Sequence, residues 1–276
     1  MTNPTDIPIA LTIAGSDPSG GAGIQADLKT FAAHHVYGAA VLTALTAQNT
    51  IGVQGVHGIP PAFVTQQIES VLGDLEVGAI KTGMLATTEI IAAVCDGLDT
   101  RGDIPAIVDP VMVATSGDPL LEETAEEAVR RTLLPRARLI TPNIPEAARL
   151  LGAAQATSID EMEAQARALL VLGPGAVLVK GGHGIGTNAT DVLFDGVEMH
   201  RFSAPWVETK NTHGTGCTLS AAIAARLAAG ASLIAAVDGA KRYVHAAISR
   251  AAQVTIGGGR GPLIHHDPST MPHRAE

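Results

Sequence analysis

The 276-residue sequence is poor in aromatic residues, in cysteine and in charged residues. Aromatic residues make up 3% of the chain and hydrophobic residues 46%, so the core must consist mainly of aliphatic side chains. The two cysteines, Cys95 and Cys217, are too few for a disulfide framework and are typical of a protein from a reducing compartment. The net charge of −9 disfavours a surface that binds nucleic acid or an anionic membrane.

No segment has the sequence of a membrane span or of a targeting peptide. The most hydrophobic candidate, residues 217–237, has Arg226 near its middle and more alanine than leucine, so we expect it to form a pair of buried helices. The first residues, MTNPTDIP, have no basic region, and the apolar run at 9–14 is too short for a signal peptide. We therefore expect a globular cytoplasmic protein.

Short apolar runs alternate with helical patterns along the chain. The predicted strands are residues 7–14, 39–46, 79–82, 106–108, 139–141, 176–180 and 192–194, and residues 214–229 and 232–253 are predicted helices. This alternation is typical of an α/β fold, in which helices cover both faces of a mostly parallel sheet. No repeat or linker divides the chain, so we expect one domain over residues 1–276. Residues 257–276 are expected to be loosely structured, with a flexible tail from about 267.

Polar side chains follow the predicted strands at the end where each strand stops. They are Ser16, Asp17, Gln48, Asn49, Lys81, Thr82, Asp109, Asn143, Lys180 and His183. Because parallel strands end at a common edge, where α/β proteins bind their ligands, we expect these residues to form one composite site. The alternative is that they are ordinary polar residues of unrelated turns.

Two glycine-rich segments are candidates for binding a nucleotide, and the sequence favours the second. Residues 21–26, GAGIQA, match a dinucleotide fingerprint, but six residues separate them from the preceding strand and the next strand ends in Gln48 instead of an acid. The sequence also contains no P-loop motif. Residues 211–217, NTHGTGC, open an Ala-rich helix, so three or four backbone N–H groups of this Gly-Thr-Gly turn are expected to converge on a transferring phosphoryl group. A glycine-rich helix cap without a ligand is the alternative.

Cys217 and Cys95 differ in their predicted surroundings. Cys95 lies within an apolar helical stretch and is interpreted as a core residue. Cys217 lies in the first turn of the helix after the Gly-Thr-Gly turn, a position that lowers the pKa of a thiol. We therefore expect a thiolate that accepts a proton from an attacking hydroxyl group, and covalent catalysis is the alternative.

Asn143 and Glu146 allow two interpretations. Their N-x-x-E spacing after a strand is typical of a capping box at a helix N-terminus. Glu146 is alternatively a carboxylate that orders water around Mg²⁺, a role that Asp109 would share. Lys180, at the end of a strand, is interpreted either as a cation that meets phosphate groups or as a solvated surface lysine.

Seven motifs carry a resemblance to a known family over most of the chain. They are ALTIAGSDPSGGAGIQADLKTF (10–31), VLTALTAQNTIGV (41–53), KTGML (81–85), VDPVMVATSGD (108–118), LITPNIPEA (139–147), VLVKGGH (177–183) and NTHGTGCTLSAAIA (211–224). By these motifs the sequence resembles the bacterial hydroxymethylpyrimidine/phosphomethylpyrimidine kinases of thiamine biosynthesis, a branch of the ribokinase superfamily. Sugar kinases of that superfamily typically have Asp at the position of Cys217. In having cysteine there, the sequence resembles the vitamin kinases of the superfamily.

The resemblance implies a ribokinase-like fold and two successive phosphorylations that use ATP and Mg²⁺. The first would convert 4-amino-5-hydroxymethyl-2-methylpyrimidine to its monophosphate and the second would make the diphosphate, in an enzyme expected to be a homodimer. By the same resemblance, Gln48, Asp27 and Met84 would contact the pyrimidine; Gly214, Thr215, Gly216 and Cys217 would form the anion hole and catalytic position; and Asn143, Glu146, Lys180 and Lys241 would serve Mg-ATP.

Three other functions compete with this one. A pyridoxal kinase would have the same fold, and its acceptor is also a hydroxymethyl heteroaromatic compound. A binding or regulatory protein without catalysis is disfavoured because residues 214–217, Glu146 and Lys180 are all intact. A dinucleotide oxidoreductase is disfavoured by the missing tight turn and the missing ribose-binding acid.

Overall fold

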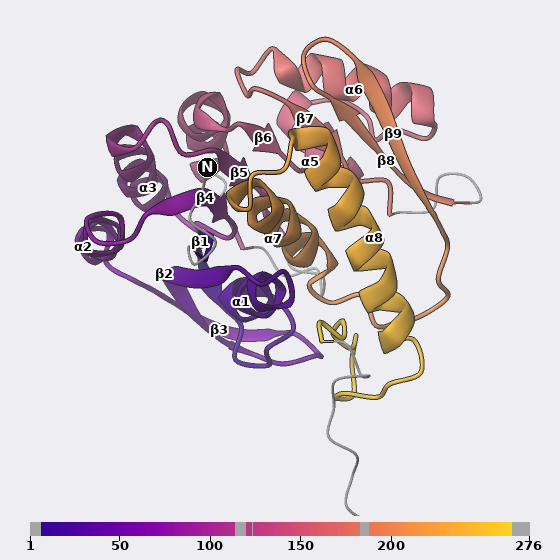
Figure 1. Ribbon diagram of the computed structural model, residues 1–276, viewed down its shortest axis with the longest axis horizontal. Coiled ribbons are helices and arrows are strands. Elements are labelled where there is room, and N and C mark those ends of the chain that lie inside the picture. Colours follow the sequence, from indigo (N-terminus) through magenta and orange to yellow (C-terminus); the bar gives the residue numbers. More distant parts are fainter. Residues whose placement is uncertain (1–6, 114–119, 123, 183–187, 267–276) are drawn as a thin grey trace, which may run out of the picture.

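The computed structural model describes residues 7–113, 120–122, 124–182 and 188–266, and within these residues nine strands form one sheet (Figure 1). The order of the strands is β3-β2-β1-β4-β5-β6-β7-β8-β9. Neighbouring strands from β2 to β7 are parallel, whereas the pairings that involve β3, β8 and β9 are antiparallel. The predicted α/β class with a mostly parallel sheet is confirmed.

All seven predicted strands are present, with ends that differ by a few residues. The strands are β1 (Ile9–Ser16), β2 (Tyr37–Gln48), β3 (Val53–Gly58), β4 (Val77–Thr82), β5 (Ala106–Val108), β6 (Leu139–Ile140), β7 (Val177–Val179), β8 (Asn188–Phe194) and β9 (Met199–Pro205). The helices are α1 (Gly23–Ala33), α2 (Pro61–Leu72), α3 (Thr88–Thr100), α4 (Ala125–Ala128), α5 (Ile144–Leu151), α6 (Ile159–Leu170), α7 (Thr215–Ala228) and α8 (Leu233–Ala251). Short π and 3-10 segments, η1 (Val129–Leu133) and η2 (Leu134–Arg136), follow α4. The helices predicted at 214–229 and 232–253 correspond to α7 and α8.

The strands that sequence reasoning missed are β3 and β9. Both lie at the edges of the sheet and pair antiparallel with one neighbour. β3 contains two glycines and is mostly exposed, and β9 is only half-buried. Neither strand therefore has the continuous apolar run that marks a strand buried on both faces.

Alternating residues of the central strands divide the core into two layers. Ala10 and Ala79 face the layer that contains α1, α7 and α8, whereas their neighbours Leu11 and Ile80 face the layer of α2, α3, α5 and α6 (Figure 1). Small residues on the first face allow the Ala-rich α7 to approach the sheet closely, and a Cβ at Gly78 would lie 3.2 Å from the Cα of Ala228. This packing holds the N-terminal end of α7 at the carboxyl edge of the strands. No described helix is both long and apolar enough to cross a membrane.

The segment that ends at residue 266 packs against the rest of the protein more closely than expected. Leu263 and His265 are buried, and Nε2 of His265 lies 2.9 Å from the hydroxyl of Thr218 on α7. The hydroxyl of Tyr243 on α8 donates a hydrogen bond of 3.0 Å to the carbonyl of His265. The prediction of a loosely structured segment is therefore wrong for residues 261–266, because they pack against α7 and α8. Residues 257–260 are mostly exposed, and their hydrogen bonds are to Thr50. The tail predicted from about 267 lies outside the described residues.

Candidate active site

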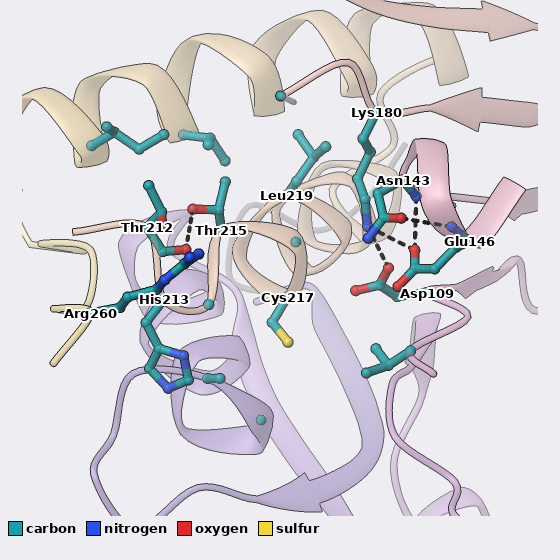
Figure 2. A pocket seen from close by; sticks show the side chains of 18 of the residues that line it. Asp109, Asn143, Glu146, Lys180, Thr212, His213, Thr215, Cys217, Leu219 and Arg260 are labelled. Atoms are coloured by element: carbon teal, nitrogen blue, oxygen red, sulfur yellow. Dashed lines mark hydrogen bonds and ion pairs between the residues drawn. The ribbon is translucent and has the colours of Figure 1, made fainter. Parts of the chain in front are cut away.

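A cavity of about 660 Å³ lies at the carboxyl edge of the parallel strands. Its lining includes Ser16 and Asp17 of β1 and its following loop, Gln48 of β2, Lys81 of β4, Asp109 after β5, Asn143 after β6 and Lys180 after β7. The start of α7 and one side of α8 complete the wall (Figure 2). The expected clustering is confirmed for these residues, because their strands end at one edge of the sheet. Asn49 and Thr82 do not line the cavity, and His183 lies outside the described residues.

The turn before α7 leaves backbone N–H groups at a helix N-terminus without acceptors in the part of the chain that the structure describes. Gly214 has φ +80°, and a Cβ there would overlap the carbonyl oxygen of Gly21, so only glycine fits at this close approach of two loops. The hydroxyl of Thr215 donates a hydrogen bond of 2.7 Å to the carbonyl of Thr212 and braces the turn (Figure 2). Among the described residues, the N–H groups of Gly216 and Cys217 find no acceptor. These two donors lie at the positive end of the α7 dipole, where an anion is favoured.

Cys217 points from the first turn of α7 into the cavity, between His213 on one side and Asp109 on the other (Figure 2). The expectation of a lowered thiol pKa is wrong for this structure: burial raises the pKa of Cys217 to about 11. Lys81 opposes this rise, whereas the carboxylates of Asp27 and Asp109 add to it. The helix terminus alone does not decide the pKa, because the thiol lies in a partly closed cavity that also contains negative charge. Cys95 is buried as expected.

The far side of the cavity contains a cluster of one cation and two carboxylates. Nζ of Lys180 lies 2.7 Å from Oδ1 of Asp109 and 3.9 Å from Oε2 of Glu146 (Figure 2). Burial would lower the pKa of Lys180, but the two carboxylates raise it. Lys180 is therefore a charged cavity residue and not a solvated surface lysine.

Asn143 and Glu146 form the capping box at the start of α5. Oδ1 of Asn143 accepts a hydrogen bond from the N–H of Glu146, and Oε2 of Glu146 accepts one from the N–H of Asn143, both at 2.8 Å. The capping interpretation is confirmed, and it does not exclude a second role, because both residues also line the cavity. Burial raises the pKa of Glu146 to about 7, since the nearby Lys180 offsets only part of the loss of solvation.

The residues expected to contact the pyrimidine separate into two groups. Gln48 and Met84 line the cavity, and Met84 packs over Gly15, where a Cβ would lie 3.1 Å from its Sδ. The prediction that Asp27 contacts the pyrimidine is wrong, because its side chain is fully buried and does not line the cavity. Its Oδ2 lies 2.8 Å from Nζ of Lys81 and accepts a hydrogen bond of 2.6 Å from the hydroxyl of Thr12. Asp27 therefore neutralises a lysine in the wall, because an unpaired buried cation would be strongly unfavourable.

Lys241 reaches the cavity from α8. Its Nζ lies 2.8 Å from Oδ2 of Asp191 on β8. The wall around this pair is largely apolar and includes Pro205, Val207 and Val244. Beside the charged Lys241, this end of the cavity therefore offers an apolar surface that suits a flat, weakly polar group.

Sequence reasoning missed a buried pair at the base of the cavity. Nε2 of His213 lies 2.8 Å from Oδ2 of Asp17, which also accepts a hydrogen bond of 2.8 Å from the N–H of Ala22. This pair joins the loop after β1 to the turn that carries Gly214. The two residues are separated by 196 positions, so no local spacing indicates their contact. The sequence signal was limited to a polar residue at the end of one strand and a histidine beside a glycine turn.

Curated relatives share much of this sequence. A hydroxymethylpyrimidine/phosphomethylpyrimidine kinase of Rhizobium meliloti is 57% identical over 258 residues, which cover 94% of this chain and 96% of the relative. The enzyme of the same description from Escherichia coli is 51% identical over 257 residues, which cover 93% and 96% of the two chains. The chain is therefore similar to these proteins over nearly its whole length.

Solved structures share the fold. A phosphomethylpyrimidine kinase of Clostridium difficile superimposes with a TM-score of 0.78 at 42% identity and covers 88% of this chain and 100% of its own. A Bacillus subtilis pyridoxal kinase in complex with ADP superimposes with a TM-score of 0.86 at 36% identity and covers 94% and 98%. The fold thus does not separate the two kinase types, whereas sequence identity is higher to the pyrimidine kinases. The family model for phosphomethylpyrimidine kinase matches residues 17–264, and the chain belongs to this family, with its ribokinase-like fold.

Proposed function

We propose that this protein phosphorylates 4-amino-5-hydroxymethyl-2-methylpyrimidine and then its monophosphate, with ATP as the phosphoryl donor. The observation that carries the proposal is that one cavity joins Gln48 and Met84 to the N–H groups of Gly216 and Cys217, which have no acceptor among the described residues. The amide of Gln48 offers a donor and an acceptor to the aminopyrimidine edge, and Met84 offers an apolar surface to the ring. The acceptor hydroxyl would then lie towards the start of α7.

In each step an acceptor oxygen bonds to the γ-phosphorus of ATP while the bond from that phosphorus to the bridging oxygen breaks and ADP leaves. Negative charge on the transferring group is stabilised by the N–H groups at the start of α7, which need no reorganisation. In the first step the hydroxymethyl group also loses a proton, and we assign its acceptance to the thiolate form of Cys217. This is the minor form near neutral pH, because the pKa of the thiol is raised to about 11. In the second step the attacking phosphate oxygen is already ionised, so no base is needed.

The nucleotide is assigned to the opposite side of the cavity. Lys180 would contact its phosphate groups, and Lys241 would approach them from α8. The apolar wall of Pro205, Val207 and Val244 would take the base. ADP and AMP-PCP complexes of structurally similar kinases support the use of such a nucleotide.

Mg²⁺ fits the donor set beside Lys180. The described residues contain no group of three or more metal-ligating side chains, so a cation held by protein groups alone is not supported. Asp109 and Glu146 lie together on the phosphate side, and Mg²⁺ in proteins usually has one or two carboxylates, several waters and substrate phosphates as ligands. We assign Asp109 and Glu146 to this ion, with Asn143 supporting Glu146. When bound, Mg²⁺ neutralises charge on the nucleotide phosphates.

We also propose that the enzyme is a cytoplasmic homodimer of single-domain subunits. The two cysteines, both free thiols, fit a reducing compartment. The dimer is an expectation from the family resemblance. Light scattering of the purified protein tests it, and a mass near the 28.1 kDa of one chain would contradict it.

A product assay tests the function. The protein is incubated with hydroxymethylpyrimidine, ATP and Mg²⁺, and monophosphate and diphosphate are resolved by chromatography. We expect both products, and an assay with pyridoxal under the same conditions provides the comparison, because similar pyridoxal kinases have the same fold. Faster turnover of pyridoxal would overturn the choice of acceptor. Binding of the pyrimidine without ATP consumption would indicate a binding protein.

A further inference from the structure

The two acceptors of the proposed function differ by one phosphate group, and this inference rests on that function. Near neutral pH such a phosphate carries almost two negative charges. An enzyme that binds both acceptors in one cavity therefore needs a cation that is engaged only when the acceptor is phosphorylated. The lysine and arginine residues of the cavity wall are the candidates.

All but one of these described cations already have a carboxylate partner. Lys81 is paired with Asp27, Lys180 with Asp109, Lys241 with Asp191 and Arg149 with Glu126. Arg260 also lines the cavity, but its side chain is exposed and has no hydrogen bond or ion pair with another described residue. Within the described part of the chain, Arg260 is therefore the cavity lysine or arginine that is free to meet an added anion.

The backbone of Arg260 is fixed between the two halves of the acceptor site. Its N–H donates a hydrogen bond of 3.0 Å to the carbonyl of Thr50, two residues beyond Gln48. The carbonyl of the next residue, Gly261, accepts a hydrogen bond of 3.1 Å from the N–H of His213, beside the anion-hole turn. Figure 2 shows the Arg260 side chain reaching towards Thr212 and Thr215 of that turn.

The glycines on either side of Arg260 explain this close attachment. A Cβ at Gly259 would overlap the carbonyl oxygen of Thr50, and a Cβ at Gly261 would overlap the side-chain amide of Asn211. Asn211 is itself buried and donates hydrogen bonds to the carbonyls of Ala251 and Val254. The chain can thus lie against both loops, and it presents one charged side chain from a fixed position.

We propose that Arg260 binds the phosphate group of the monophosphate acceptor and so favours the second phosphorylation. A guanidinium group suits this role, because its planar fork donates two parallel hydrogen bonds to phosphate oxygens. One oxygen of the held phosphate then attacks the γ-phosphorus, a P–O–P bond forms, and ADP leaves. The unphosphorylated acceptor has no anionic group for Arg260 to bind, so the first step does not use this residue.

Steady-state kinetics of Arg260→Gln with each acceptor separately test the proposal. We expect KM for the monophosphate to rise roughly tenfold or more, as for loss of a charged hydrogen bond. KM for hydroxymethylpyrimidine and KM for ATP should stay within about twofold, because neither involves Arg260 in this proposal. Arg260→Lys should recover part of the loss, since it keeps the charge but not the fork. The matched control is Arg131→Gln, which removes an exposed charge outside the cavity wall.

Three results would overturn the proposal. One is an unchanged KM for the monophosphate. Another is an equal rise of KM for both acceptors, which would indicate a distorted site, and the third is a rise confined to ATP, which would assign Arg260 to the nucleotide. Calorimetric titration with the monophosphate, without ATP, separates this proposal from the proposed function. If wild-type protein turned over neither acceptor, weaker monophosphate binding by Arg260→Gln would still support the phosphate contact, and equal binding would refute it.

Discussion

Replacing Asp17 by Asn tests how much the buried pair of Asp17 and His213 contributes to the stability of the fold. One oxygen of Asp17 faces both the ring of His213 and the N–H of Ala22, each at 2.8 Å. The second oxygen accepts hydrogen bonds from the N–H and hydroxyl of Ser19. The side-chain amide of the Asp17→Asn variant has one oxygen and one NH₂ group in place of the two oxygens. In either orientation of the amide, the NH₂ group faces a backbone N–H donor, that of Ala22 or that of Ser19, and cannot accept its hydrogen bond. The substitution therefore removes charge and hydrogen bonds with little change in size.

The pKa of Asp17 provides the magnitude. Burial would raise this pKa, but the hydrogen bonds from His213 and Ser19 lower it from 3.8 to about 2. The difference of about 1.8, at 1.36 kcal/mol per pKa unit, corresponds to about 2 kcal/mol of folding free energy. Because the folded-state pKa is the lower one, this stability is present above about pH 4. It is lost as the pH falls from about 4 towards 2.

Urea unfolding at several pH values is the assay. At pH 7 we expect Asp17→Asn to lower the free energy of unfolding by about 2 kcal/mol, and the deficit should shrink below about pH 4. Asp103→Asn is the control, because this side chain is 77% exposed and lies 3.7 Å from Arg101, so we expect a change within about 0.5 kcal/mol. Wild-type stability of Asp17→Asn at pH 7, or a deficit that persists undiminished at pH 3, would refute the reasoning.

Three further substitutions separate the roles assigned in the cavity. Cys217→Ala should slow the first phosphorylation about tenfold or more and the second much less, because only the first must release a hydroxyl proton. Single-turnover assays measure the two steps separately, and equal effects on both would refute the role of Cys217 as a base. Gln48→Ala should weaken pyrimidine binding about tenfold without changing ATP binding, and an unchanged Kd in calorimetry would remove Gln48 from the acceptor site. Wild-type kcat/KM should fall as the pH drops below about 7, where Glu146 becomes protonated. Glu146→Gln, which can still cap α5, should have low activity and no such inflection, and a pH profile like that of the wild type would exclude Glu146.

The alternation of short apolar runs with helices was enough to predict the central sheet. Strands such as β4 and β5 are buried on both faces, so their sequences show the continuous apolar run that marks a parallel strand. β3 lacks this signal, because it is an exposed edge strand that depends on its antiparallel pairing with β2. Its formation therefore depends on a neighbour and not on its own pattern.

The candidate site was predictable where position along one element places the residue. Gln48, Asp109 and Lys180 end or follow parallel strands, and this alone brings them to the common edge. Asp27 was misplaced, since its position on α1 does not show that Lys81 from β4 lies against it. The contact depends on how α1 packs on the sheet, which no spacing in the sequence reports.

The fold class, the polar edge of the sheet and the Gly-Thr-Gly turn at the start of α7 are predictable from the amino-acid sequence, because they follow from local conformation and hydrophobic periodicity. The raised pKa of Cys217, the pairing of Asp17 with His213 and the place of Arg260 between two loops are known only from the folded chain. They are not predictable locally, because burial and electrostatic energy depend on all the groups that surround a side chain. In a parallel sheet with crossover connections, those groups come from segments far apart in the chain.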